Sequence, residues 1–276
     1  MAEPSLATYT AEWLTLRSRR CARGPPLQSD KANCGRRSID WSAAVVSQWA
    51  RVALRTQLLG TSYLVLPDGT PPYPGVVVIH ELYGLNDNIR DICHRFAEQG
   101  YAALGVDLFA RRNKAICMAR IMVDWLAGRL DDFAVADLKA ALARLVERPE
   151  VDAGRVGAVG FCLGGTLALT WACTDSRLKA IGPYYGSAPR RREALRRLCP
   201  VVGSWPEKDF TSGAVGTLET ELTSAGVAHD LKLYPGARHS FFNDRESSYD
   251  AAAAADSWQR VLSFFDAHIK AARNAL

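Results

Sequence analysis

Apolar and polar positions form two kinds of segment from about residue 57 onward. Short runs rich in β-branched residues, such as GVVVIH at residues 75–80, are typical of strands buried on both faces of a sheet. Longer segments, such as residues 86–99, repeat their apolar side chains at helical spacing and end at a glycine, here Gly100. Strands and helices that follow one another in this way predict an α/β fold with a mostly parallel sheet and helices on both faces.

The predicted elements continue to the end of the chain. We predict strands at residues 75–80, 102–106, 156–160, 180–184, 201–203 and 230–234. We predict helices at residues 86–99, 116–126, 131–148, 164–173, 190–198, 216–225 and 251–272. A parallel sheet binds its ligands where the strands end, at their carboxyl edge, so residues that follow a strand are the candidates for chemistry.

Residues 1–55 differ from the rest in pattern and in charge. They show no sustained period apart from one short helix predicted at residues 41–54, with Ser38 or Asp40 as its N-cap. They hold nine basic and four acidic residues, so the whole net charge of +5 lies here and residues 56–276 are neutral. We interpret them as a basic N-terminal extension, packed on a domain at residues 56–276 or mobile. A dedicated nucleic-acid reader would carry its positive charge on the folded domain, so that class is disfavoured.

Composition narrows the class of protein further. Of the 276 residues, 48% are hydrophobic and 23% are charged, as in ordinary soluble globular proteins. No apolar run approaches the roughly 18 residues that a membrane-spanning helix needs, so we expect no membrane association. The seven cysteines are scattered without a C-x-x-C pair, which disfavours a zinc ribbon or a thioredoxin-type motif. We expect a cytoplasmic protein with no metal and no cofactor, and a monomer is slightly favoured.

One short motif carries candidate chemistry. The sequence GFCLGG at residues 160–165 lies between a predicted strand and a predicted helix and matches G-x-nucleophile-x-G, with Cys162 in the nucleophile position. A nucleophile at such a turn takes a strained backbone conformation, and its neighbours must be small because chain segments pass closely. The N-terminus of the following helix favours a thiolate and an oxyanion alike. A buried structural cysteine is the alternative, and the strand–turn–helix context favours the nucleophile.

A cysteine nucleophile needs a histidine base and a group that orients this base. His239 lies in a loop after a late strand and before the last helix, where the chain order nucleophile–acid–histidine places the base. Asp209 lies in a loop after a strand, between Cys162 and His239, and is the predicted acid; Glu207 is the weaker competitor. Of the other histidines, His80 ends the first buried strand near the predicted site. The remaining three are interpreted as structural, solvated or surface residues: His94, His229 and His268.

Residues 61–272 resemble the dienelactone hydrolase family of α/β-hydrolases. The matching segments are VVVIHELYGLNDNIRDICHRFAEQGYAALGVDLFAR, VGAVGFCLGGTLAL, PYYG, LYPGARHSFFND and SYDAAAAADSWQRVLSFF. The resemblance implies that Cys162 is the nucleophile and that Asp209 and His239 complete a triad. It also implies that Glu81 contacts the resting thiol and takes part in its activation when substrate arrives. The residues alone leave a second interpretation of Glu81 open, as a strand-end acid paired with an arginine.

The resemblance also implies how the site is completed. Two backbone N–H groups, those of Leu82 and Leu163, would form the oxyanion hole. Four aromatic residues are candidates for the pocket walls, although each is also compatible with the core: Tyr83, Phe109, Trp125 and Tyr184.

One position departs from the family pattern. Members that bind the carboxylate of a dienelactone use an arginine four positions after the triad histidine, and here that position is Asn243, with Arg245 as the nearest arginine. Three other arginines are candidates for positive charge on the other side of the site: Arg111, Arg112 and Arg120. Dienelactone itself is therefore disfavoured as the substrate, whereas another small ester or lactone is not.

Together these observations predict a hydrolase of small carboxylic esters or lactones that works through an acyl-enzyme on Cys162. Its activity would resemble that of a carboxymethylenebutenolidase, and its partner would be a small-molecule substrate. The alternative is a redox-sensing or non-catalytic binding protein, because peroxide also attacks an activated thiolate at a helix N-terminus. The complete triad disfavours this alternative, since a sensor needs neither an orienting acid nor oxyanion donors. An interaction protein that uses the basic extension is a third class, disfavoured by the neutral domain.

Overall fold

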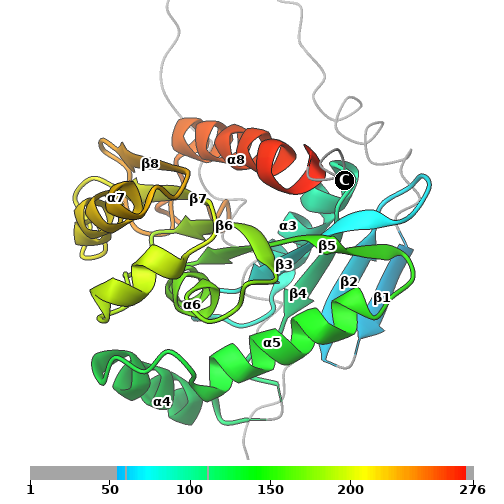
Figure 1. Ribbon diagram of the computed structural model, residues 1–276, viewed down its shortest axis with the longest axis horizontal. Coiled ribbons are helices and arrows are strands. Elements are labelled where there is room, and N and C mark those ends of the chain that lie inside the picture. The colour runs from blue at the N-terminus through cyan, green and yellow to red at the C-terminus, as the bar shows by residue number, and fades with distance from the viewer. Residues whose placement is uncertain (1–54, 60, 111, 272–276) are drawn as a thin grey trace, which may run out of the picture. The chain divides into compact units, whose positions relative to one another are not determined.

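One eight-stranded sheet, in the order β1-β2-β4-β3-β5-β6-β7-β8, runs through the computed structural model (Figure 1). The structure describes residues 55–59, 61–110 and 112–271. The helix predicted at residues 41–54 and nearly all of the predicted extension lie outside the described residues, as does Arg111. The strands are β1 (Arg55–Leu59), β2 (Ser62–Leu66), β3 (Tyr73–Ile79), β4 (Ala102–Val106), β5 (Val151–Phe161), β6 (Leu178–Tyr184), β7 (Val201–Pro206) and β8 (His229–Tyr234).

The strand order creates a ligand-binding position. All neighbouring pairs from β4 to β8 are parallel, whereas β2 pairs antiparallel with β1 and with β4. From β3 the chain moves outward to β4 and then returns to the other side of β3 as β5, so the direction of winding reverses between β3 and β5. Open α/β sheets bind ligands beyond the carboxyl ends of the strands at such a switch point. Glu81 follows β3 and Cys162 follows β5.

Helices cover both faces of the sheet. In Figure 1, α3 and α8 lie on one face, and α5 and α6 lie on the other. The helices are α3 (Asp87–Glu98), α4 (Lys114–Leu126), α5 (Phe133–Val146), α6 (Leu163–Ala172), the 3₁₀ helix η2 (Arg192–Arg197), α7 (Gly213–Ala225), α8 (Ala251–Phe265) and the π-helical turn η3 (Asp266–Lys270). Side chains that precede α3, α5 and α8 accept backbone N–H groups of the first turn and so cap these helices: Asn86, Asp132 and Asp250.

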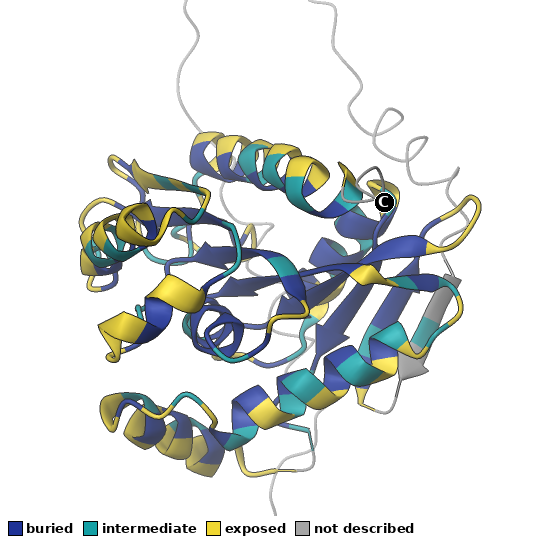
Figure 2. Ribbon diagram, in the orientation of Figure 1, coloured by how far each residue is buried: buried dark blue, intermediate teal, exposed yellow. Residues whose placement is uncertain are grey.

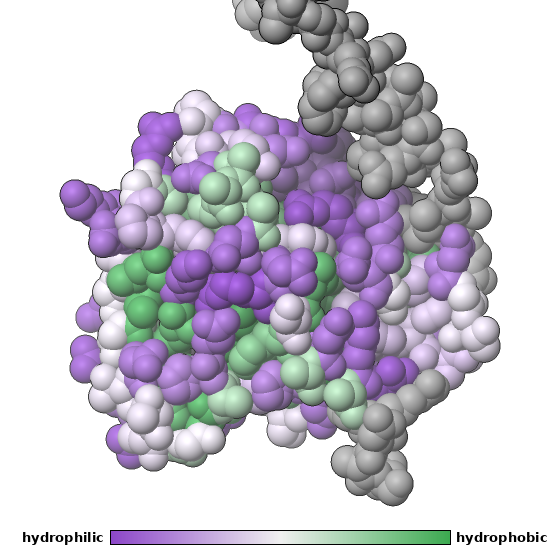
Figure 3. All heavy atoms as spheres, turned by 90° about the horizontal axis from the view of Figure 1, so that it is seen from above, coloured by the Kyte–Doolittle hydropathy of each residue, from purple (hydrophilic) through white to green (hydrophobic). Residues whose placement is uncertain are grey.

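The core lies along the central strands. Every residue of β3 and β4 is buried, and Figure 2 shows these central strands buried while the outer sides of the helices are exposed. On the side of α8, hydrophilic residues cover much of the surface and hydrophobic ones show between them in small groups (Figure 3). Helix α4 differs, because it also exposes large apolar side chains: Ile116, Met122, Val123 and Leu126.

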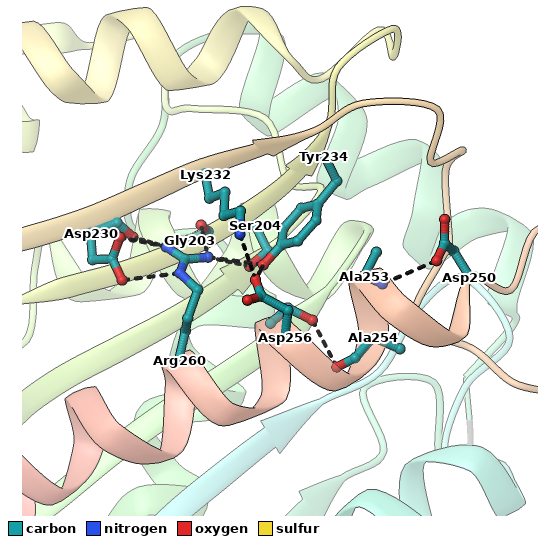
Figure 4. Close-up of polar contacts among 11 residues, drawn as sticks. Gly203, Ser204, Asp230, Lys232, Tyr234, Asp250, Ala253, Ala254, Asp256 and Arg260 are labelled. Carbon is teal, nitrogen blue, oxygen red and sulfur yellow. Dashed lines mark hydrogen bonds and ion pairs between the residues drawn. The ribbon is translucent and has the colours of Figure 1, made fainter.

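A polar network fastens α8 to β7 and β8 (Figure 4). The Arg260 guanidinium forms an ion pair with Asp230 at 2.6 Å and donates to the hydroxyl groups of Ser204 and Tyr234, both at 3.2 Å. Asp256, one helical turn earlier, accepts from the Tyr234 hydroxyl at 2.7 Å. The network fixes the two strands whose following loops carry Asp209 and His239.

The structure confirms the mostly parallel α/β sheet, and it corrects several predicted elements. The antiparallel hairpin β1–β2 was not predicted, because β1 begins with polar residues, as edge strands often do, and gives little apolar signal. The predicted helix at residues 190–198 is only the short η2, bracketed by Pro189 and Pro200. The helix predicted at residues 216–225 begins at Gly213, and the helix predicted at residues 251–272 changes at Asp266 into η3.

Candidate active site

Cys162 forms the turn between β5 and α6, with φ +54° and ψ −112°. Residues other than glycine rarely adopt positive φ, so the turn holds this side chain on a strained backbone. The turn fits because its neighbours lack side chains. A Cβ on Gly160 would lie 2.1 Å from the Gly164 carbonyl oxygen, and a Cβ on Gly164 would lie 2.3 Å from the Ile79 carbonyl oxygen. This is the geometry of a nucleophile elbow, which exposes the thiol above the carboxyl edge of the sheet.

Two other non-glycine residues in the described part of the chain have positive φ, and both lie beside Cys162's predicted partners. Tyr185 (φ +37°) follows β6, and its ring centroid lies 5.0 Å from that of His239. Ser240 (φ +63°) donates its hydroxyl to Glu81 Oε1 at 2.9 Å. Backbone strain gathered in one place is typical of functional sites.

Asp209 and His239 form a hydrogen-bonded pair. His239 Nδ1 lies 3.0 Å from Asp209 Oδ2, and the carboxylate is 5% exposed while the imidazole is 25% exposed. Asp209 Oδ1 accepts from the backbone N–H and the hydroxyl of Thr211. A buried carboxylate on Nδ1 fixes the tautomer that leaves Nε2 unprotonated. Nε2 is buried and has no hydrogen-bond partner among the described residues, so it is free to take a proton.

The loop that carries His239 also binds Glu81, whose side chain is buried directly after β3. Glu81 Oε1 accepts from Ser240, and Oε2 accepts from the Asn243 amide at 2.9 Å. Two neutral donors thus bind the carboxylate, and no arginine pairs with it among the described residues. Glu207, the competing acid for the triad, is exposed beyond β7, and its backbone N–H donates to Tyr234.

His80 fixes the loop after β3. It is buried, and its Nδ1 lies 2.6 Å from the Glu81 carbonyl oxygen while its Nε2 accepts the backbone N–H of Leu108 at 3.1 Å. Burial lowers the pKa of His80, so the neutral ring with Nδ1 as donor fits both bonds. The peptide that it holds joins Glu81 to Leu82. Because the C=O and N–H of a trans peptide point in opposite directions, this bond also fixes the Leu82 N–H.

The Cys162 thiol is protonated at rest. Burial and, second, the Glu81 carboxylate raise its pKa to about 12, with a smaller contribution from Asp209. The backbone N–H of Leu163 acts in the opposite direction, which places this donor beside the sulfur. A thiol in this state is a weak nucleophile until its proton is accepted.

A cavity of about 280 Å³ opens beside the thiol, and no charged residue lines it. Its walls include the two expected oxyanion donors, Leu82 and Leu163, together with apolar side chains of α4 and the ring of Phe210. Phe210 is 80% exposed and stacks on His239 with ring centroids 4.8 Å apart. The cavity can therefore hold the apolar part of a ligand next to Cys162, Leu82 and Leu163, and its Phe210 wall contacts His239.

Of the four aromatic residues predicted as pocket walls, only Trp125 lines this cavity, so the prediction needs correction for the other three. Tyr184 is the last residue of β6 and stacks in the core on Phe161, with ring centroids 4.7 Å apart; Tyr185, the next residue, lines the cavity instead. Phe109 packs on His80, and the exposed Tyr83 lies outside the lining. The prediction also omitted Phe210, Thr211 and Ser240, each of which neighbours a predicted residue or lies two positions from it.

Two of the three arginines considered as sources of positive charge, Arg112 and Arg120, lie elsewhere, and Arg111 is outside the described residues. Arg112 pairs with Asp137, and the Arg120 guanidinium lies over the ring of Phe133 at 4.7 Å. The part of the chain that the structure describes holds no group of three or more His, Cys, Asp or Glu side chains suited to a metal ion. In the same part, no helix is long and apolar enough to cross a membrane.

Comparison with known proteins identifies relatives of this arrangement. A family described as the dienelactone hydrolase family matches residues 61–269. A Yersinia pestis protein named "Putative carboxymethylenebutenolidase" is 32% identical over 222 residues, which cover 75% of this chain and 83% of that protein. The crystal structure of a dienelactone hydrolase-like promiscuous phosphotriesterase from metagenomic libraries is 26% identical, with a TM-score of 0.66, over 79% of this chain and 98% of that chain. A Pyrococcus horikoshii acylaminoacyl peptidase, 12% identical with a TM-score of 0.62 over 84% of this chain and 44% of that chain, shares the α/β-hydrolase fold alone.

Proposed function

The chain belongs to the dienelactone hydrolase family and is a hydrolase of that type, and we propose that it cleaves small carboxylic esters or lactones through an acyl-enzyme on Cys162. The observation that carries this proposal is the hydrogen-bonded Asp209–His239 pair, whose Nε2 has no partner among the described residues, together with a thiol at a strained strand–helix turn. A nucleophile, an oriented base and backbone donors for the oxyanion are the parts that acyl transfer uses.

In the first half-reaction, Glu81 accepts the thiol proton and the Cys162 sulfur attacks the substrate carbonyl. The carbonyl oxygen becomes negative and receives hydrogen bonds from the backbone N–H groups of Leu82 and Leu163. The carbon–oxygen bond to the alcohol then breaks, and the proton first removed from the thiol is delivered to the leaving oxygen. A thioester remains on Cys162.

In the second half-reaction, His239 Nε2 takes a proton from water, and the resulting hydroxide attacks the thioester. Asp209 stabilises the imidazolium that forms. The carbon–sulfur bond breaks, the carboxylic acid leaves, and the thiolate regains a proton from His239. The balance is one ester and one water converted into one acid and one alcohol.

The cavity also supports a substrate that is uncharged next to its reacting carbonyl. No charged side chain lines the cavity at Cys162, and Asn243 binds Glu81 where dienelactone-binding relatives carry an arginine. A carboxylate placed next to the carbonyl would be buried there without a partner, which is costly. Esters and lactones with an apolar group at this position fit the walls.

A short-chain p-nitrophenyl ester tests the proposal. We expect turnover by the wild-type protein, an acyl adduct on Cys162 by mass spectrometry, and a loss of about 10⁴-fold or more in Cys162→Ala. Cys173→Ala is the matched control, because Cys173 is also buried but lies at the far end of α6. Equal turnover by Cys162→Ala and the wild type would refute the mechanism.

A redox-sensing role fits the site less well. Peroxide reacts with the thiolate, and burial together with Glu81 raises the pKa of Cys162 to about 12, so almost no thiolate is present near neutral pH. The hydrolase uses the same feature to keep the thiol unreactive until substrate is bound.

A further inference from the structure

A second hollow, of about 370 Å³, adjoins the cavity at Cys162. Four residues line both spaces: Trp125, Ser187, Phe210 and Thr211. Because they share these walls, the two spaces adjoin, with an inner space at the thiol and an outer space farther along. We call the outer space the arginine groove, since Arg190 and Arg192 line it.

The arginine groove differs from the inner cavity in charge. Two arginines and no acidic residue line it, whereas no charged residue lines the inner cavity. Neither Arg190 nor Arg192 forms an ion pair with any carboxylate in the described ranges, although other arginines of this region do, as Arg196 with Glu221 at 2.8 Å. Their hydrogen-bond donors are therefore available to a ligand.

The loop that carries these arginines is tied to the inner cavity. Its Ser187 N–H donates to the Thr166 hydroxyl at 2.9 Å, and its Ala188 carbonyl oxygen accepts from Trp125 Nε1 at 3.3 Å. The Arg190 guanidinium lies over the Trp125 ring, 5.4 Å from its centroid. Trp125 thus forms a wall of the inner cavity and also positions Arg190 in the groove.

We propose that the substrate is an ester or lactone with two different ends, an apolar reacting end at Cys162 and a carboxylate at the other end held by Arg190 and Arg192. The inference rests on the proposed function and adds a substrate class to it. A planar guanidinium binds a carboxylate with two parallel hydrogen bonds, and two arginines in a groove that no acidic residue lines favour an anion. The uncharged inner cavity requires that this carboxylate be separated from the reacting carbonyl by a spacer.

Matched substrates test the proposal. One series consists of p-nitrophenyl monoesters of dicarboxylic acids of increasing length, each compared with the same compound capped as its methyl ester. A second series places the carboxylate or a carboxamide on the phenol of a phenyl butyrate, because the groove could receive either side of the ester. We expect a preference for the acid-ended compound that is absent in the shortest members and reaches about tenfold in kcat/KM in a longer member of at least one series.

The variants are Arg190→Gln, Arg192→Gln and the double variant, with Arg191→Gln as the control. Arg191 carries the same charge in the same loop, but its side chain lies beside Gly128 and not in the groove. We expect the double variant to lose the preference, measured as the ratio of kcat/KM for each acid-ended compound and its capped partner, and Arg191→Gln to keep it. Added salt should weaken the preference in the wild type, because exposed charges are screened.

Two outcomes would overturn the inference. One is the absence of any preference for acid-ended compounds in both series. The other is a preference that survives the double variant or falls equally in Arg191→Gln, which would reflect net charge and not the groove. Either outcome leaves the proposed hydrolase intact if p-nitrophenyl butyrate is still cleaved, and loss of that cleavage in the wild type would refute the hydrolase itself.

Discussion

Replacing Glu81 by glutamine removes the negative charge that faces the Cys162 thiol. Burial and then Glu81 raise the pKa of this thiol to about 12, so at pH 8 only about 1 in 10⁴ molecules carries a thiolate. Two charges about 5 Å apart interact by roughly 3 kcal/mol at an effective dielectric constant near 20, and partial exposure reduces this value. We therefore expect the pKa of Cys162 to fall by roughly one to two pH units and to stay above the ordinary value, because burial remains.

The rate of Cys162 alkylation by iodoacetamide, followed against pH, measures this change. Below the pKa the rate is proportional to the thiolate fraction. At each pH near neutrality, Cys162 of Glu81→Gln should therefore react about 10- to 100-fold faster than Cys162 of the wild type. Ester turnover should fall in the same variant by about 10²-fold, because the acceptor of the thiol proton is lost. Faster alkylation together with slower turnover is a combination that general destabilisation of the site would not produce.

Glu221→Gln is the matched control for this experiment. Glu221 lies on α7 and pairs with Arg196 of η2. Its replacement therefore changes the net charge by the same amount without touching the site. The glutamine at position 81 would keep an acceptor for Ser240 but would present an amide N–H toward the Asn243 donor, at a cost of about 1–2 kcal/mol in stability. Unfolding curves of both variants separate this cost from the chemistry. If alkylation and turnover are both unchanged in Glu81→Gln, the carboxylate does not act on the thiol and is only a strand-end acid.

Three other perturbations test the frame around the site. His80→Leu should lower the free energy of unfolding, measured in urea, by about 2 kcal/mol or more, because it leaves the Glu81 carbonyl and the Leu108 N–H buried and unpaired. His80→Gln should recover part of this loss. Equal stability of the leucine and glutamine variants would be contrary to expectation. Arg260→Leu should cost about 1–3 kcal/mol by the same measurement, whereas Lys232→Leu, which breaks only an exposed pair, should cost less than about 1 kcal/mol. Stability should also fall as pH rises above about 9. Burial raises the pKa of Cys173 and Cys199 to about 12, so the folded state keeps protons that the unfolded state loses, at up to about 1.4 kcal/mol per pH unit for each thiol; a flat profile between about pH 8 and pH 10.5 would contradict this assignment.

The fold and the positions of the key loops could be predicted because their signals are local. The GFCLGG turn encodes its own geometry, since small residues on both sides of Cys162 are what a close approach of backbone requires. The order of the strands then brings the loops that carry Asp209 and His239 to the same edge of the sheet. Polar edge strands such as β1 carry no comparable signal, so the hairpin was missed.

The walls of the site could not be predicted in the same way. Tyr184 and Tyr185 are identical neighbours in the sequence, and which of them faces the cavity depends on where β6 ends and on the positive φ of Tyr185. The contacts of Glu81 with Ser240 and Asn243 join residues 159 and 162 positions apart. No periodicity reports such a contact, because it arises only when the sheet and its loops are assembled.

Asn243 links the state of the thiol to the choice of substrate. An arginine at this position would neutralise the Glu81 carboxylate and weaken its effect on Cys162, whereas an amide donates a hydrogen bond and leaves the charge in place. The full charge raises the pKa of the thiol and keeps the sulfur unreactive before substrate binds. No charged residue lines the inner cavity, so the proposed carboxylate of the substrate would be bound farther from the reacting carbon. Arg190 and Arg192, which form no ion pair among the described residues, line the groove that adjoins this cavity and are placed to meet that requirement.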